Sequence, residues 1–288
     1  VVKTSTFTLT VNAPTPTTVG KYFELPSTWS TKIGGTLSER QAVWNNPMTG
    51  SSLLMADILG DATSLIVNRG PWSSVHCVAN NSDPLKTVSF VTAGHDVAIA
   101  NNWNILRIPS SCNPPGEADG HVVVINADDN RYLWEFNGAR KDASGNWSAV
   151  RLHRWDRQGG MNSIYGGGGR GVNAKYTANT EGTTACSASA TIAQGTILRD
   201  ELNAGVINHA LRWIYHGESD TGHTSYYPCV AYRSGFVNRP NAGRMGERFM
   251  LDPNINVDAL NIGKDMKTIL KAGQQYGWIF SDSTSVGG

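Results

Sequence analysis

Short stretches of alternating apolar and polar residues, each bounded by Gly, Pro, Asn or Asp, recur along most of the chain. The clearest are residues 64–68, 86–91, 121–126, 132–136, 150–155 and 206–215. Such spacing is typical of β-sandwiches and barrels. Only residues 50–59 and 265–275 have apolar residues at helical spacing, so a doubly wound α/β fold is not expected. The pattern predicts an all-β fold, an antiparallel β-sandwich with one or two short helices.

The N-terminal segment differs from the rest of the chain. Residues 4–12 alternate like a half-buried strand, and residues 13–18 form a stiff linker of Ala, Pro and Thr. This segment resembles the last strand and exit linker of an immunoglobulin-like module, with residues 19–288 forming the β-sandwich domain. The alternative is a strand added to the main sheet. Because no signal peptide precedes this strand-like start, we interpret the chain as a mature fragment.

Composition excludes several classes of partner. The 24 basic and 23 acidic residues are dispersed and leave a net charge of +1, so no nucleic-acid footprint is present. No apolar run approaches the roughly 18 residues of a membrane span. Only 16% of the residues are charged, and 31 are Gly. We expect a secreted, extracellular monomer with a neutral, hydroxyl-rich surface.

The four cysteines indicate the same compartment. None forms a CxxC pair, which disfavours zinc knuckles and thioredoxin chemistry. An even number in a Ser/Thr/Gly-rich chain predicts two disulfides. We favour Cys77–Cys112 and Cys186–Cys229 because each pair is local in sequence. Two other connectivities, or four buried thiols, remain alternatives.

Residues 119–136 (DGHVVVINADDNRYLWEF) predict a β-hairpin with a three-residue loop at 128–130. This loop pairs Ala127 with Arg131 and Val123 with Glu135. One face then carries alternate residues of both strands: His121, Val123, Ile125, Arg131, Leu133 and Glu135. The other face is the natural core or aromatic platform: Val122, Val124, Tyr132, Trp134 and Phe136. A two-residue loop would reverse this parity and separate His121 from Glu135.

The hairpin supplies the first candidate site. Glycoside hydrolysis needs two carboxyl groups across the scissile bond, one protonated and one ionised. Asp119 and Glu135 are our candidates for this pair. His121, a diagonal neighbour of Glu135, could set the protonation of one carboxyl group. The alternative is that Glu135 is a solvated residue on an amphipathic strand.

A second constellation lies in residues 197–216 (ILRDELNAGVINHALRWIYH). The polar segment RDELN, which could form a helix, precedes a strand on which His209, Trp213 and Tyr215 would share a face with Ile207 and Leu211. We name His209 as a candidate catalyst and the neighbouring polar and aromatic residues, together with Trp134, as candidate sugar-binding residues: Arg199, Glu201, Trp213 and Tyr215. The alternative is a histidine satisfied within the core.

Metal and cofactor signals are weak. Residues 216–227 combine His, Glu, Asp and Tyr, but their spacing matches no zinc signature, and a polar turn explains them equally well. Asp128 or Asp129 could hold a structural calcium, although the EF-hand spacing is absent. The Gly-rich residues 159–171 lack the P-loop pattern and fit a loop over a cleft or a surface loop. We expect no cofactor.

Residues 105–282, with DGH…YLWEF, a Gly-rich loop, INHALRW and QQYGWIFSD, resemble secreted bacterial jelly-roll sandwiches, some of them carbohydrate-active. The resemblance implies an enzyme that acts on a polysaccharide or cell-wall glycan. Our first hypothesis is a glycoside hydrolase. The second is a polysaccharide lyase in which His209 or Tyr215 removes a proton and Arg199 neutralises a uronate. The third is a non-catalytic adhesin that binds glycan.

Overall fold

The computed structural model describes residues 31–45, 73–92, 96–116, 119–129, 131–156, 164–165, 174–176, 192–215, 226, 229, 231–233 and 243–283. Several predictions lie outside these residues: the strands at 4–12 and 64–68, the module boundary at 1–18, the helix at 50–59, the Gly-rich loop at 159–171 apart from 164–165, and most of the polar cluster at 216–227.

Two sheets dominate the first half of the described structure. A five-stranded sheet has the order β1 (Val75–Ala79), β4 (Val122–Asn126), β5 (Tyr132–Asn137), β8 (Arg151–Asp156) and β9 (Ile164–Tyr165). A four-stranded sheet has the order β3 (Ile105–Arg107), β2 (Leu85–Phe90), β7 (Trp147–Ala149) and β6 (Arg140–Lys141). The pairs β1–β4 and β2–β7 are parallel, so these sheets are mixed and not purely antiparallel as predicted.

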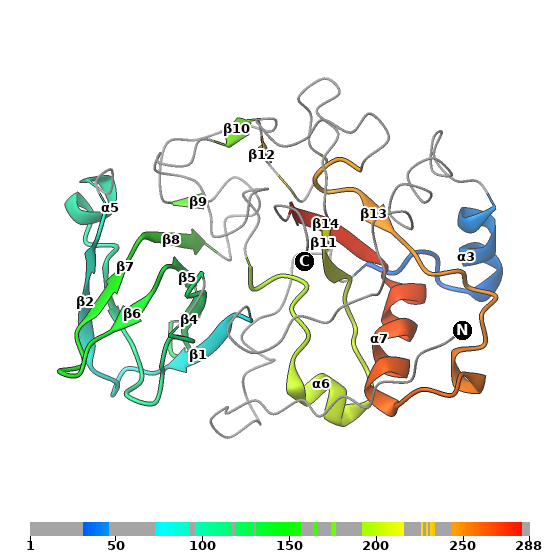
Figure 1. Cartoon of the computed structure of the whole chain (residues 1–288), viewed down its shortest axis with the longest axis horizontal. Helices are drawn as coiled ribbons and strands as arrows, with labels where there is room; N and C mark the ends of the chain where they lie inside the picture. The colour runs from blue at the N-terminus through cyan, green and yellow to red at the C-terminus, as the bar shows by residue number, and fades with distance from the viewer. Residues whose placement is uncertain are drawn as a thin grey trace.

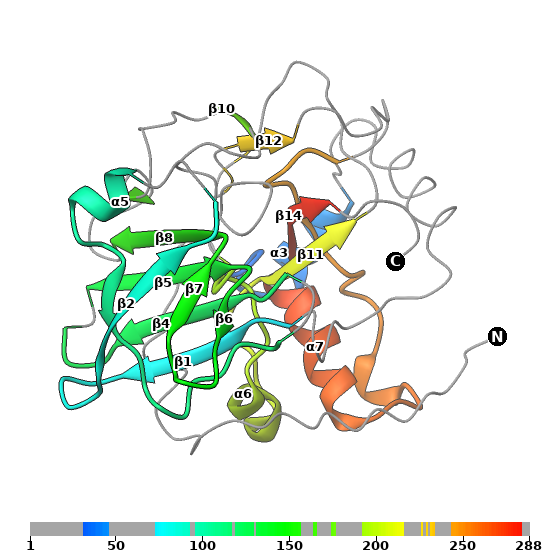
Figure 2. The same ribbon diagram turned by 60° about the vertical axis from the view of Figure 1, so that its left-hand side comes forward.

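The second half combines short strands with helices. β11 (Leu211–Tyr215), β14 (Trp278–Ser283) and β13 (Arg248–Phe249) form a three-stranded sheet, and β10 (Ala174–Tyr176) pairs with β12 (Ala231–Arg233). The helices are α3 (Leu37–Trp44), α5 (Asp96–Ala100), α6 (Arg199–Ala204), η3 (Val257–Ala259) and α7 (Lys264–Gln275). Figures 1 and 2 show the two larger sheets on one side of the molecule and α3, α7, β11 and β14 on the other.

The five-stranded sheet is buried on both faces. One face shares a core with the four-stranded sheet, in which Val122, Val124 and Phe136 meet Val88 and Trp147. On the other face, residues from the C-terminal half cover part of the sheet: Ile192, Ala193, Cys229, Met245 and Phe280. The sequence predicted a single core face on this hairpin. Burial of the second face explains why β4 is apolar at four successive positions.

The predicted elements can be compared with those observed. The strands predicted at 86–91, 121–126, 132–136 and 150–155 are β2, β4, β5 and β8 to within one residue at each end, and the described structure is mainly β, as predicted. The strand predicted at 206–215 begins only at Leu211. His209 therefore lies in the turn before β11 and does not share a strand face with Trp213.

Helix α7 confirms the helical spacing at 265–275. Its buried stripe includes Ile269, Ala272 and Gly273, three to four residues apart. This stripe packs against β11 and β14 (Figure 1). A Cβ at Gly273 would lie 2.0 Å from the indole ring of Trp278, so glycine permits this close packing.

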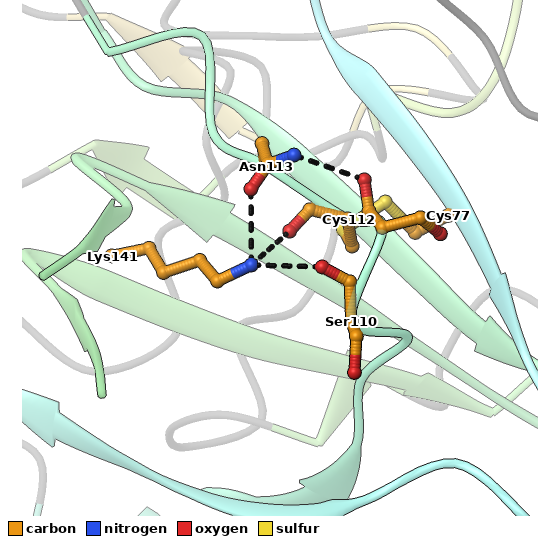
Figure 3. Close-up of a disulfide and its surroundings, with 6 residues drawn as sticks. Cys77, Ser110, Cys112, Asn113 and Lys141 are labelled. Atoms are coloured by element: carbon orange, nitrogen blue, oxygen red, sulfur yellow. Dashed lines mark hydrogen bonds between the residues drawn. A yellow bond between two sulfur atoms is a disulfide. The ribbon is translucent and has the colours of Figure 1, made fainter. Parts of the chain in front are cut away.

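The predicted disulfide Cys77–Cys112 is present and joins β1 to the segment after β3. Lys141 supports this segment from β6 (Figure 3): its Nζ donates to the carbonyl oxygens of Ser110 and Cys112 and to Oδ1 of Asn113, at 2.9–3.1 Å. The second predicted disulfide, Cys186–Cys229, includes Cys186, which lies outside the described residues. Its predicted partner Cys229 is described and is buried. No helix in the described ranges has the length and apolar character of a membrane span.

Candidate functional site

The segment Asp119-Gly120-His121 is held by main-chain hydrogen bonds as it enters β4. The amide of Ala139 donates to the Gly120 carbonyl at 3.0 Å, and the amide of Val75 donates to the His121 carbonyl, also at 3.0 Å. Gly120 has a φ of +55°, and a Cβ there would lie 2.8 Å from the amide nitrogen of Ala139. Only glycine fits this position without strain. The backbone thus fixes the two flanking side chains.

The side chains of Asp119 and His121 face each other across this glycine. Nε2 of His121 lies 3.6 Å from Oδ2 of Asp119; the imidazole side chain is 14% exposed and the carboxylate side chain 58%. Hydrogen bonding to His121 lowers the pKa of Asp119, and the charge of His121 adds to the effect. Nδ1 of His121 is buried and has no hydrogen-bond partner within the described structure. Nε2 is therefore the ring nitrogen that could exchange a proton with a molecule bound beside Asp119.

Arg140 brings a positive charge to the same place. A Cβ at Gly120 would lie 2.6 Å from Nη1 of Arg140, so the guanidinium group lies against the glycine that separates Asp119 from His121. Nη1 also donates to the carbonyl of Ala139 at 2.8 Å. The Arg140 side chain is exposed. Base, carboxylate and cation therefore occupy one surface region at the start of β4.

Behind this region the sheet carries partly or fully buried polar side chains on several of its strands. The strand registers place His76 of β1, Val123 of β4, Glu135 of β5 and His153 of β8 side by side. Because side chains alternate, all four lie on the face that carries His121. We call the polar residues at this end of the face the polar half-face: Ser74, His76, His121, Glu135, Asn137, Arg151 and His153. The other end of the face is apolar and belongs to the core.

Glu135 is the most deeply buried member of the polar half-face. The predicted pairing of Val123 with Glu135 is confirmed, but the carboxylate has no exposed surface. Its Oε2 accepts hydrogen bonds from Nε1 of Trp155 and from the amide of Ile192, both at 3.0 Å. Glu135 therefore ties β5 to β8 and to the segment that covers the sheet.

His76 lies at the β1 edge of the same row. Its Nε2 is 3.0 Å from Oγ of Ser74. Burial lowers the pKa of His76 to about 4, which keeps the ring neutral around pH 7. The polar half-face therefore carries a neutral imidazole on β1 and the carboxylate of Glu135 on β5, with Val123 of β4 between them. Within the described residues, no group of three or more His, Cys, Asp or Glu side chains has a geometry that could hold a metal ion.

The second predicted constellation forms a separate pair. Nε2 of His209 lies 2.9 Å from Oε1 of Glu201, and Nδ1 lies 2.8 Å from the carbonyl of Ala210. Burial lowers the pKa of His209, but the hydrogen bond and charge of Glu201 and the Ala210 carbonyl outweigh it, so the net shift is upward. Oε2 of Glu201 accepts from the amide of Leu198, which caps α6. Since both ring nitrogens are occupied, this pair locks α6 to the turn before β11.

The predicted sugar-binding residues are dispersed. Arg199 is exposed on the first turn of α6. Trp213 packs against the core on the apolar end of the sheet face. Trp134 lies on the opposite face, where its Nε1 donates to the Trp103 carbonyl at 3.0 Å. Tyr215 ends β11, opposite Ser283. The contacts within the described ranges join Asp119 with His121 and Glu201 with His209, and they connect neither pair to Glu135.

Sequence reasoning missed His76, His153 and Arg140. His76 and His153 reach the polar half-face through pairings with strands that lie far along the chain. A signal was available for β8, because RLHRWD alternates and places His153 and Trp155 on one face. Arg140 approaches Gly120 through the turn between β5 and β6, which the sequence does not specify.

No protein-family model, curated protein or solved structure matches the chain.

Proposed function

We propose that this protein is an extracellular enzyme that cleaves a carboxylated polysaccharide by β-elimination at the Asp119–His121–Arg140 region. The observation that carries the proposal is the imidazole of His121, 3.6 Å from an exposed carboxylate, with a guanidinium group against the intervening glycine. A β-elimination needs a base and a cation that neutralises the sugar carboxylate. These are the groups gathered here.

In the proposed reaction, Nε2 of His121 removes the C5 proton of a uronate residue, because Nδ1 is buried and Nε2 faces the exposed Asp119. Arg140 pairs with the uronate carboxylate and stabilises the negative charge that develops on it. The C4–O bond breaks as the C4=C5 double bond forms, and the departing oxygen takes a proton that the imidazolium can return. Asp119, whose lowered pKa keeps it ionised, stabilises the imidazolium between these steps.

Hydrolysis by an Asp119–Glu135 pair has less support. That mechanism requires two carboxyl groups that both reach the scissile bond, one of them protonated. Glu135 has no exposed surface, and one of its oxygens already accepts two N–H groups. In the proposal, Glu135 has a structural role, because it ties β5 to β8 and to the segment that covers the sheet. His209 holds α6 in place, since its Nε2 contacts Glu201 and its Nδ1 contacts the carbonyl of Ala210.

An extracellular location agrees with the disulfide, since disulfides persist in oxidising compartments. The two larger sheets share one core, which agrees with a β-sandwich, although each contains a parallel strand pair. A nearly neutral composition, with a net charge of +1 and 16% charged residues, suits a protein that works on glycans. These features support the proposed substrate class and do not depend on the reaction.

The test is a screen of polyuronates such as polygalacturonate and alginate, read by two assays in parallel. We expect a rise in ultraviolet absorbance from the unsaturated product together with new reducing ends. Reducing ends without absorbance would show hydrolysis and contradict the elimination. Binding without either signal would identify a non-catalytic glycan-binding module.

Two arginines make a matched pair for this assay. We expect Arg140→Ala to lower kcat/KM on the active polyuronate by about 10²-fold or more, the scale of a lost charge-stabilising contact. Arg199→Ala removes another exposed arginine, on α6, and should leave kcat/KM unchanged. The reverse result would place the uronate at α6 and contradict the proposed centre.

A further inference from the structure

The strand β6 brings Arg140 to the proposed reaction centre, although it consists of Arg140 and Lys141 alone. It lies at the edge of the four-stranded sheet, where it pairs with β7. A two-residue edge strand has few main-chain hydrogen bonds, so side-chain contacts help to determine its position. Because side chains alternate along a strand, Arg140 and Lys141 point to opposite faces.

The side chain of Lys141 is anchored through its ammonium group. Nζ donates to the carbonyl oxygens of Ser110 and Cys112 at 2.9 and 3.1 Å and to Oδ1 of Asn113 at 3.0 Å (Figure 3). An ammonium group has three N–H donors, so each of them has an acceptor here. Nζ also lies 5.9 Å from the ring centroid of Trp147. Lys141 therefore ties β6 to the segment after β3.

This segment is in turn fixed to β1. Cys112 is buried and forms the disulfide with Cys77 of β1. Two residues before Cys77, the amide of Val75 donates to the carbonyl of His121 at 3.0 Å. Strand β1 thus holds His121 directly, and it holds β6 through the disulfide and Lys141. The base and the cation of the proposed centre are therefore attached to the same strand.

The side chain of Arg140 has little that fixes it independently of β6. Its Nη1 donates to the carbonyl of Ala139 at 2.8 Å, and within the described ranges this is its one hydrogen bond. On the N-terminal side of Arg140, the amide of Ala139 holds the chain to Gly120. On the C-terminal side, Lys141 holds it to the disulfide-bonded segment. Loss of the lysine contacts would leave β6 held mainly from one end.

We infer that Lys141 is a positioning residue, which holds β6 against the disulfide-bonded segment and so places Arg140 beside Gly120. The consequence for cleavage rests on the proposed function, whereas the placement of Arg140 does not. A displaced guanidinium group loses its alignment with a uronate carboxylate, and a misplacement of about 1 Å can lower a rate by about 10²-fold. Lys141 acts through Arg140 and does not itself contact substrate.

NMR relaxation of the Arg140 amide in the full chain tests the placement without any reaction. We expect an order parameter of about 0.85 in the parent and below about 0.6 in Lys141→Met. Methionine keeps an unbranched apolar side chain beside Trp147 but has no N–H donor. Thermal unfolding verifies that the variant retains its fold.

Two further variants complete this measurement. Lys86→Met is the matched control, because Lys86 is also half-buried in the same sheet, on β2, and forms no hydrogen bond within the described residues. It should leave the Arg140 amide as rigid as in the parent. Asn113→Ala removes one of the three acceptors and should give a smaller loss of order, and it decides the question if Lys141→Met does not fold.

A double-mutant cycle on the active polyuronate tests the consequence for cleavage. We expect Lys141→Met to lower kcat/KM about tenfold in the parent. In an Arg140→Ala background the same change should lower kcat/KM less than about twofold, because the group that Lys141 positions is already absent. A lysine that only stabilises the fold would lower kcat/KM equally in both backgrounds.

An Arg140 amide that stays rigid in folded Lys141→Met would overturn the inference, and so would equal losses in the two backgrounds. If Arg140 becomes mobile in the variant but the parent forms no unsaturated product from any polyuronate, the positioning role stands and the elimination fails. If product forms and Arg140 stays rigid, the reaction stands and the positioning role fails.

Discussion

At the scale of single residues, Glu135 illustrates how a carboxylate can support a site without touching a ligand. It has no exposed surface, and its Oε2 accepts one N–H from a neighbouring strand and one from the covering segment. A buried acceptor that satisfies two donors stabilises the fold mainly because its removal would leave both donors unpaired. His121, two positions before the residue paired with Glu135, then lies on a face that is already fixed.

This role predicts different outcomes for two substitutions of Glu135. Glu135→Gln keeps an oxygen that can accept both N–H groups, and we expect it to lower the free energy of unfolding by about 1 kcal/mol. Glu135→Leu leaves the donors of Trp155 and Ile192 without an acceptor, and we expect a loss of about 2–4 kcal/mol. Urea denaturation measures both values. A leucine variant as stable as the glutamine variant would contradict the role.

At the scale of elements, the His209–Glu201 pair joins α6 to the turn before β11. Glu201 raises the pKa of His209 above its ordinary value. The imidazole of His209 therefore binds its second proton more tightly in the folded protein than in the unfolded chain. The stabilisation is therefore complete below the unfolded pKa of about 6.5 and is lost as the pH rises through the higher folded value.

His209→Gln should remove this pH dependence. We expect the variant to be less stable than the parent by about 1–2 kcal/mol near pH 5.5, where the parent imidazole is charged. The difference should shrink at about pH 8.5. Denaturation curves at the two pH values give the comparison. A difference that grows with pH would reverse the sign and contradict the ion pair.

The elements also show how far sequence reasoning reached. The hairpin register, and with it the shared face of His121 and Glu135, followed from local alternation and a three-residue loop. The parallel pairing of β1 with β4 joins segments more than forty residues apart, and no local pattern encodes it. The same limit hid His76 from the candidate site. On β11, the apolar alternation that suggested an early start reflects Ile207 packing against α7 and not a strand.

At the scale of the whole molecule, burial on both faces of the five-stranded sheet joins the two halves of the chain. One core cluster holds the two larger sheets together, and a second includes Met245 and Phe280 from the C-terminal half. Glu135 of the polar half-face accepts a hydrogen bond from the amide of Ile192 in the second half. The packing behind the proposed centre therefore involves both halves of the chain.

The disulfide stabilises the first of these cores. Cys77 and Cys112 are separated by 35 residues, and both lie within the cluster between the two larger sheets. A loop of that length predicts a loss of about 3–4 kcal/mol in the Cys77→Ala/Cys112→Ala variant. Urea denaturation with and without reductant gives the value. If reductant leaves the midpoint of the unaltered protein in place, the bond does not carry this stability.

The central claim is that His121 transfers the proton in the cleavage of a carboxylated polysaccharide. The most direct measurement is the rate of unsaturated product formation by His121→Gly, with and without added imidazole. We predict that the variant is inactive on the polyuronate that the parent cleaves and that imidazole restores part of the rate, because the base is then supplied from solution. Full activity without imidazole, or inactivity that imidazole leaves unchanged in a folded variant, would contradict it.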